Sequence, residues 1–227
     1  MRLKLLIGIP LAIAVAVVGG SWFYIKVLSD DPPAKLTVDS SSSSTTAAGS
    51  AAVDDGTTDG TWKASAASVV GYRVKETLFG ASNEAAGRTS KVTGSIAISG
   101  TSVLEGSFTV DMTSVTSDKT QRDGQFRNRI MNTSQFPTAT FKLTSPIRLS
   151  SVALDDTVTT KATGNLTLHG VTKKISFDIT AKRVTGQIRA NGAIPIHFAD
   201  YDINNPSGGP ASVGDDGTLE FTLVFTR

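Results

Sequence analysis

The chain of 227 residues contains no cysteine and two histidines, His169 and His197. The lack of cysteine excludes a thiolate nucleophile, a thiolate metal site, a disulfide and a lipid-modified N-terminal cysteine. Two histidines leave little with which to build a histidine-rich zinc site, and they offer few bases to a catalytic serine or threonine. We therefore expect a fold that is stabilised by its core alone, with no cofactor and no catalytic activity.

Charge and aromatic side chains are also sparse. The net charge is +2, and no block of lysine and arginine interleaved with aromatic residues occurs, so nucleic acid is not an expected partner. Aromatic residues make up 7% of the chain, and ten of the fifteen are phenylalanine. This composition indicates a core of phenylalanine, valine, isoleucine and leucine.

The N-terminus carries one long apolar run, Leu5–Ile25, of 21 uncharged residues. As a helix it would measure roughly 30 Å, the thickness of a hydrocarbon core. Trp22–Tyr24 stand where an aromatic belt would lie, and basic residues precede the run. We predict a cytoplasmic N-terminus over 1–4 and a single-pass signal-anchor helix over 5–28, with the rest of the chain outside the cell membrane. A cleaved signal peptide is the alternative.

Residues 29–60 are rich in serine, threonine, alanine and aspartate and have almost nothing to bury. They are expected to form a disordered linker with a mean reach of roughly 30 Å. From residue 61 the pattern of apolar and polar residues changes, and 61–227 is predicted to be one globular domain.

The domain is read as all-β, because apolar residues alternate with polar ones in eight short segments separated by turn residues. Short connections favour antiparallel neighbours, and eight such strands close well into a barrel. A β-sandwich is the alternative. The segments are Val70–Val74, Val92–Ile98, Phe108–Met112, Phe141–Leu143, Leu166–Leu168, Ile175–Ile179, Ile194–Phe198 and Leu219–Phe225.

One stretch departs from this alternation. Asp118–Met131 has a thin apolar stripe with Phe126 and Ile130, and Ser117 precedes it as a candidate N-cap. The pattern predicts a short helix or helical loop between the third and fourth strands, interrupted near Gly124.

Five short motifs follow one another along the domain: Gly87–Gly94, Asp111–Asp123, Phe136–Phe141, Gly164–Lys174 and Phe198–Ile203. In their order and spacing the chain resembles the YceI-like family. The resemblance implies a lipocalin-like barrel outside the cytoplasm whose long apolar cavity holds an isoprenoid lipid, such as a polyprenyl phosphate or a quinone. Two places depart from the family pattern: Lys75-Glu76 stands where a histidine is frequent, and Asp202 stands where glycine is usual.

Candidate binding residues fall into two groups. The apolar cavity is expected to be lined by Tyr72, Phe79, Phe108, Phe126, Phe136, Phe141 and Phe177. A lipid head group is expected to meet Arg88, Arg122, Asp123 and His169 at the rim, because guanidinium groups suit phosphate oxygens. The plainer interpretations are a filled core, a turn residue at His169 and an Arg122–Asp123 clasp that holds the helical loop.

Three functions remain open. The first is a membrane-tethered binding or carrier protein for an isoprenoid lipid. The second is a structural or stress-related envelope protein with a packed barrel and no lipid. The third is a hydrolase or isomerase that uses His169 with Arg122 and Asp123.

Overall fold

The structure is a computed structural model that describes residues 32–39, 57–78, 80–208 and 211–227. The predicted anchor over 5–28 and Phe79 lie outside these residues. Within the described part of the chain, no helix is long and apolar enough to cross a membrane.

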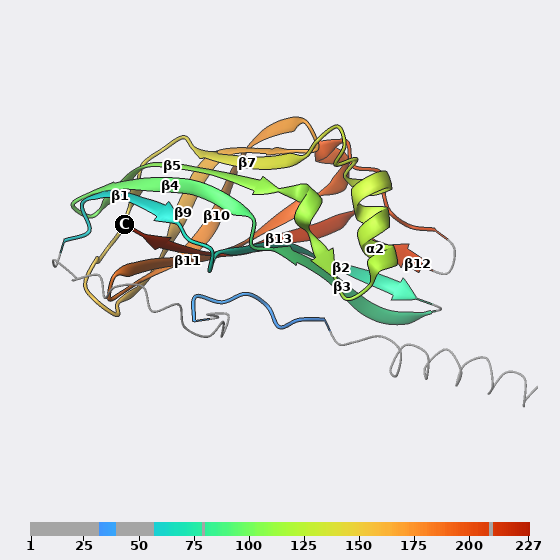
Figure 1. The fold of residues 1–227 in the computed structure, drawn as a ribbon, viewed down its shortest axis with the longest axis horizontal. Coiled ribbons are helices and arrows are strands. Elements are labelled where there is room, and N and C mark those ends of the chain that lie inside the picture. Colours follow the sequence, from blue (N-terminus) through green and yellow to red (C-terminus); the bar gives the residue numbers. More distant parts are fainter. Residues whose placement is uncertain (1–31, 40–56, 79, 209–210) are drawn as a thin grey trace, which may run out of the picture.

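Strands dominate the domain and follow one another as an antiparallel meander (Figure 1). Two short 3-10 helices connect strands: η1 (Met112–Ser114) and η3 (Phe198–Tyr201). The strands are β1 (Gly60–Ala64), β2 (Val69–Leu78), β3 (Ala81–Thr89), β4 (Val92–Ser99), β5 (Ser102–Asp111), β6 (Thr116–Ser117), β7 (Thr138–Leu143), β8 (Ile147–Arg148), β9 (Thr157–Leu168), β10 (Val171–Val184), β11 (Gln187–His197), β12 (Ala211–Val213) and β13 (Asp216–Thr226).

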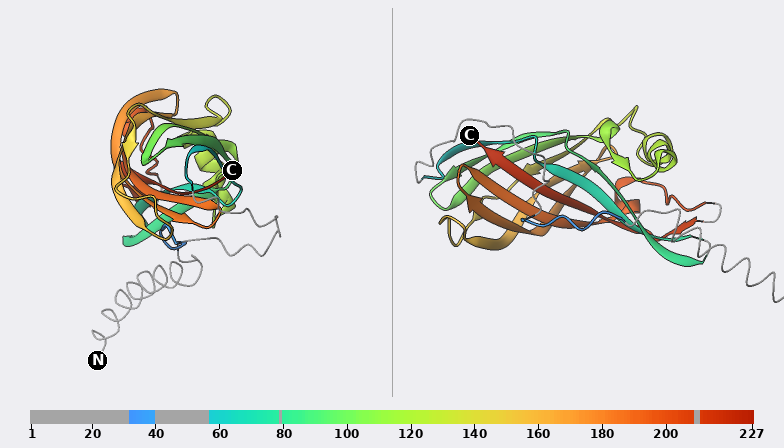
Figure 2. Two further views of the ribbon diagram at one scale, coloured as in Figure 1. Left: turned by 90° about the vertical axis from the view of Figure 1, so that its left-hand side faces the viewer. Right: turned by 60° about the horizontal axis from the view of Figure 1, so that its bottom comes forward.

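The meander closes into a ring of eight strands, in the order β1-β4-β5-β7-β9-β10-β11-β13 and back to β1. The end-on view shows this ring (left panel of Figure 2). Beside the β1–β13 pair, β2 pairs with an earlier part of β13, and β3 pairs with β2, so these two strands extend the wall beyond the ring. The predicted all-β, eight-stranded antiparallel barrel is thereby confirmed, and the sandwich alternative is wrong.

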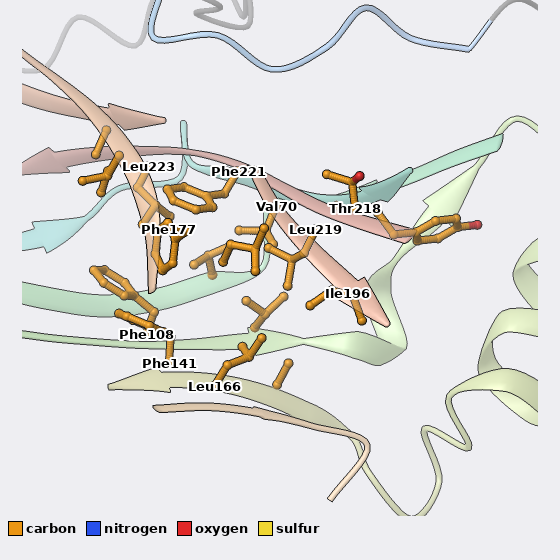
Figure 3. Close-up of a pocket in the computed structure, with 18 of the residues that line it drawn as sticks. Val70, Phe108, Phe141, Leu166, Phe177, Ile196, Thr218, Leu219, Phe221 and Leu223 are labelled. Atoms are coloured by element: carbon orange, nitrogen blue, oxygen red, sulfur yellow. The ribbon is translucent and has the colours of Figure 1, made fainter. Parts of the chain in front are cut away.

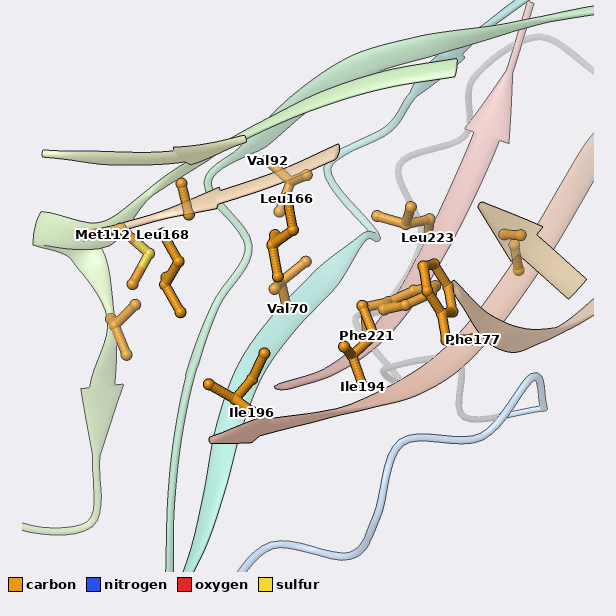
Figure 4. Packing of buried hydrophobic residues seen from close by; sticks show 14 of the residues in the cluster. Val70, Val92, Met112, Leu166, Leu168, Phe177, Ile194, Ile196, Phe221 and Leu223 are labelled. Atoms are coloured by element: carbon orange, nitrogen blue, oxygen red, sulfur yellow. The ribbon is translucent and has the colours of Figure 1, made fainter. Parts of the chain in front are cut away.

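Alternation along the strands places the core inside the barrel. On β13, Leu219, Phe221, Leu223 and Phe225 belong to the interior cluster, whereas Glu220 and Thr222 lie between them on the outer face. The same cluster takes Leu166 and Leu168 from β9 and Ile194 and Ile196 from β11 (Figure 4). Because side chains point to opposite faces in turn, each strand supplies both the inner wall and the outer surface.

The helical segment lies between β6 and β7, as α2 (Thr120–Gln125) followed by one π-helical turn, η2 (Phe126–Ile130). In the numbering of Figure 1, β3 and β4 are instead joined directly by Ser90 and Lys91. The α-helix continues through Gly124, and its N-cap is Lys119, not Ser117. Ser117 has another role: its backbone N–H and its hydroxyl both donate to Asp123, at 2.8 and 2.6 Å.

Two turns account for the positions of His169 and Asp202 in the chain. His169 (φ 49°) and Gly170 (φ 79°) join β9 to β10 and both have positive φ, as a two-residue hairpin turn of type I′ requires. Asp202 also adopts a left-handed backbone, with φ 52°. Aspartate tolerates this conformation better than most residues, so the turn survives without the glycine usual in the family.

Gly164 should tolerate a side chain poorly, since a Cβ there would lie 2.3 Å from Phe141 Cζ and 2.5 Å from the Lys142 carbonyl oxygen. We expect Gly164→Ala to lower the free energy of unfolding by about 1–3 kcal/mol, the usual cost of overpacking. Gly106→Ala is the matched control, because its Cβ would meet its nearest atom at 3.5 Å. Urea unfolding of the two variants checks this, and equal stabilities would contradict it.

Candidate functional site

The interior of the barrel contains an elongated cavity of about 820 Å³. This volume lies within the range of about 300–1,000 Å³ that is typical of ligand sites. Its middle is lined by apolar side chains from facing strands, among them Phe108, Phe141, Leu166 and Phe177 (Figure 3). The cavity is therefore a long apolar slot inside the sheet, suited to a ligand with little polar surface.

Aromatic rings form much of this slot and contact one another. Phe177 meets Phe141 and Phe221 edge to face, with centroids 5.6 and 5.9 Å apart. Phe108 lies 5.7 Å from Phe225. Such edge contacts hold the rings in place without filling the space between the strands.

Tyr72 and Phe126 line the cavity where the helical segment covers it. Their rings stack 5.1 Å apart, at 10° to one another. Burial raises the pKa of Tyr72 to about 12, so its phenol is neutral at physiological pH. The helical segment thus supplies two apolar side chains, Phe126 and Ile130, to the end of the slot next to α2, called here the α2 end.

Five of the seven predicted cavity residues therefore line it: Tyr72, Phe108, Phe126, Phe141 and Phe177. Phe136 does not. Its ring packs edge to face on His169, with centroids 4.6 Å apart, and lies against Gly170. It precedes β7 in a connection, where alternation no longer decides the direction of a side chain. Phe79 lies outside the described residues.

Small inward-facing residues also belong to the site, and sequence reasoning missed them. Ala162 and Ala190 are 1% and 5% exposed and line the cavity, as does Gly106. Alanine or glycine at positions where a strand would otherwise place a large core residue is the signal that could have indicated a hollow barrel, because each leaves space in front of it.

Charged side chains gather at the α2 end. Arg122 donates to Asp118 and to Glu76 Oε1, the latter at 3.3 Å, and both Arg122 and Glu76 line the cavity. Two carboxylates compensate the charge of Arg122, so it is less available to an anionic ligand than the sequence suggested.

Arg129 lines the same end with a different environment. Its guanidinium donates to the neutral Pro206 carbonyl oxygen at 2.7 Å, and no carboxylate among the described residues pairs with it. The positive charge of Arg129 is thus the less compensated one at this mouth. The other end of the slot is also polar, with Ser151, Asp156 and Lys182 among its lining residues.

Asp123 does not line the cavity. It is 8% exposed and accepts the two hydrogen bonds from Ser117 on β6, while the neighbouring Arg122 reaches Glu76 on β2. Together these contacts fasten the helical segment to the barrel wall. The geometry supports the clasp interpretation of this pair over a direct contact with a head group.

Arg88 is placed on the outer wall, and its expected position at the rim is wrong. Gly87 faces inward, where an added Cβ would lie 2.5 Å from the Tyr72 ring, so Arg88 faces outward. There its guanidinium pairs with Glu220 Oε1 at 2.8 Å. Arg88 and Arg122 therefore do not act together at the cavity.

The histidines are separate from the cavity lining. His169 Nδ1 contacts the Tyr201 carbonyl oxygen at 3.1 Å. His197 is exposed and its hydrogen bond with Asp216, 2.8 Å long, raises its pKa. Among the described residues, the contacts of His169, Arg122 and Asp123 do not join them into a nucleophile–base set, and no group of three or more histidine, aspartate or glutamate side chains could hold a metal ion.

Comparisons with solved structures show the same fold at low identity. A polyisoprenoid binding domain from Saccharophagus degradans is 18% identical, with a TM-score of 0.59, over 74% of this chain and 98% of that one. BcnA from Burkholderia cenocepacia is 16% identical, with a TM-score of 0.55, over 71% and 98%. A YCEI protein from Campylobacter jejuni is 19% identical, with a TM-score of 0.51, over 62% and 84%.

No curated protein matches the chain significantly. The family model described as the YceI-like domain matches residues 62–225, which include every strand that closes the barrel apart from the first two residues of β1 and the last residue of β13. With the barrel, the hairpin turn at His169 and this match in agreement, the chain belongs to the YceI-like family.

Proposed function

We propose that the barrel binds one long, apolar lipid of the isoprenoid class in its interior and acts as a binding or carrier protein, not as an enzyme. The observation that carries this proposal is the continuous apolar slot of about 820 Å³ with polar groups at both ends. The description of the Saccharophagus degradans domain as polyisoprenoid binding adds support. The same slot disfavours the alternative of an envelope protein with a packed barrel.

Burial of the lipid chain would supply most of the affinity. Each methylene moved from water into the slot contributes about 0.8 kcal/mol, so a five-carbon isoprene unit contributes about 4 kcal/mol before ordering costs. The aromatic and aliphatic side chains of the walls have no donor or acceptor that the lipid chain would have to satisfy. Polar groups at the ends would then fix the orientation of the lipid and select its head group.

The head group is proposed to lie at the α2 end. Arg129 can meet an anionic group there, while Gln121 and Gln125, which also line this end, can hydrogen-bond to a neutral carbonyl. This arrangement suits a polyprenyl phosphate better than a quinone, because a guanidinium fork matches phosphate oxygens.

The location of the protein is part of the proposal. The predicted anchor over 5–28 would tether the barrel to the outer face of a cell membrane, where isoprenoid lipids reside. A lipid could then pass from the membrane into the barrel without crossing the aqueous phase.

Filling the slot should weaken lipid binding. Ala190→Phe places a ring in the cavity, and displacing two methylenes of lipid alone costs about 1.6 kcal/mol, which is more than about tenfold in Kd. Ala193→Phe on the same strand is the control, because Ala193 is exposed on the outer face. Native mass spectrometry of the full chain, loaded with a polyprenyl phosphate or a long-tailed quinone, measures uptake. Equal uptake by both variants, or none by the parent protein, would refute an interior lipid site.

Head-group preference should depend on Arg129. We expect Arg129→Gln to weaken binding of a polyprenyl phosphate by about tenfold, since a charge-assisted hydrogen bond contributes about 1.5–3 kcal/mol, and to leave quinone binding unchanged. Arg127→Gln, in the same turn but away from the cavity lining, is the matched control. Equal losses for both ligands would place the head group elsewhere.

A further inference from the structure

The outer wall of the barrel contains side chains that are buried although they face away from the interior. Glu220 and Thr222 on β13 and Arg73 on β2 are 4%, 2% and 6% exposed. Outward-facing residues elsewhere are accessible: Lys161 on β9 and Asp178 on β10 have side chains that are 74% and 68% exposed. Something must therefore cover the wall formed by β2 and β13.

The cover is an extended segment of the chain itself, residues 32–39, which runs along the outside of the barrel (Figures 1 and 2). Its backbone carbonyl oxygens accept hydrogen bonds from side chains of four different strands. The bonds are Arg73 to Pro33 at 2.6 Å, Arg88 to Ala34, Asn191 to Leu36 at 2.8 Å and Thr222 to Thr37 at 3.1 Å. At its end, Asp39 pairs with Lys182 at 3.6 Å.

The segment was expected to be part of a disordered linker, and the structure instead gives it defined contacts. Pro32 and Pro33 favour this, because proline fixes φ and reduces the entropy lost when an extended chain docks. Neither proline has an N–H that would need a partner on the wall. The contacts use backbone acceptors, so they place little demand on side chains of the segment.

Beneath the segment lies a balanced cluster of charges. Arg73 donates to Glu84 at 2.7 Å and to both oxygens of Glu220 at 3.3 Å, and Arg88 donates to Glu220 at 2.8 Å. Burial opposes the charge of Arg73, but the hydrogen bonds that it donates to the Glu220 and Glu84 carboxylates outweigh this effect and raise its pKa. The carboxylates leave donor capacity on both guanidinium groups, and the carbonyls of Pro33 and Ala34 use it.

We propose that the outer wall presenting Arg73, Arg88, Asn191 and Thr222 is a docking site for an extended peptide, and that its occupant is residues 32–39 of the same chain. The docked segment shortens the tether. Only residues 29–31 then separate the predicted anchor from Pro32, a span of about 10 Å when fully extended. Docking itself does not depend on the anchor or on lipid binding, but this consequence for the reach of the barrel rests on the predicted anchor.

The natural lack of cysteine makes docking directly measurable. In the full chain purified in detergent, Asp39→Cys with Lys182→Cys should be joined by a short bis-maleimide within one molecule, as read by intact-mass spectrometry. Asp39→Cys with Glu105→Cys is the control, because Glu105 is exposed on β5, three strands away from β10. Equal yields in the two pairs would overturn docking, and a cross-linked dimer would overturn the assignment to the same chain.

A second variant tests the hydrogen bonds of the site. Thr222→Val keeps the shape of the side chain but removes the donor to Thr37, and Arg88→Gln removes the pair with Glu220 and the contact with Ala34. We expect the two changes together to reduce the Asp39–Lys182 cross-link severalfold, with circular dichroism confirming the fold. Lipid uptake should be unchanged, because neither residue lines the cavity. An undiminished cross-link in a folded double variant would refute the site, and failure of lipid uptake in the parent protein would bear only on the proposed function.

Discussion

The alternation of side chains along β13 is the constraint on which the rest of the structure depends. This strand pairs with β11 on one side and with both β1 and β2 on the other, so it closes the ring. Its inward residues, Phe221 among them, form the wall of the slot. On its outward face, Thr222 donates to Thr37 of the segment 32–39, and Glu220 pairs with Arg88. A one-residue slip in register would exchange these two faces and bury Glu220 among phenylalanine rings, which is why the register is strongly specified.

A hollow core is compatible with stability here because the width of a closed barrel is set by strand number and stagger. In a helical bundle, small residues would let the elements approach and close the space. In this ring, hydrogen bonds between neighbouring strands keep the walls apart even where Ala162 and Ala190 face the interior. The apolar walls of such a slot remain underpacked, so an apolar ligand would gain contacts that no side chain of the protein makes.

Sequence reasoning was most successful where one periodic signal decides the outcome. The eight alternating segments predicted the barrel, and the positive φ of His169 fits its interpretation as a turn residue. Sequence reasoning expected Arg88 at the rim of the cavity. Because Gly87 faces inward, the alternation of side chains along the strand already places Arg88 on the outer face. Phe136 was placed wrongly because it precedes its strand, where no period applies. The docked segment could not be found at all, since it is held by backbone carbonyls, and these leave no pattern in the side chains.

The same reasoning explains how a family fold persists at 16–19% identity to its solved relatives. The barrel requires alternating inward and outward side chains along each strand, small residues at some inward positions and a few turns of fixed geometry. Several residue types can satisfy each of these requirements. Asp202 illustrates this, since it adopts the left-handed backbone of the turn after η3 without being glycine. The charge cluster of Arg73, Glu84, Arg88 and Glu220 lies on the outer wall and satisfies no demand of barrel closure. Its burial beneath residues 32–39 is therefore a feature separate from the closure of the ring.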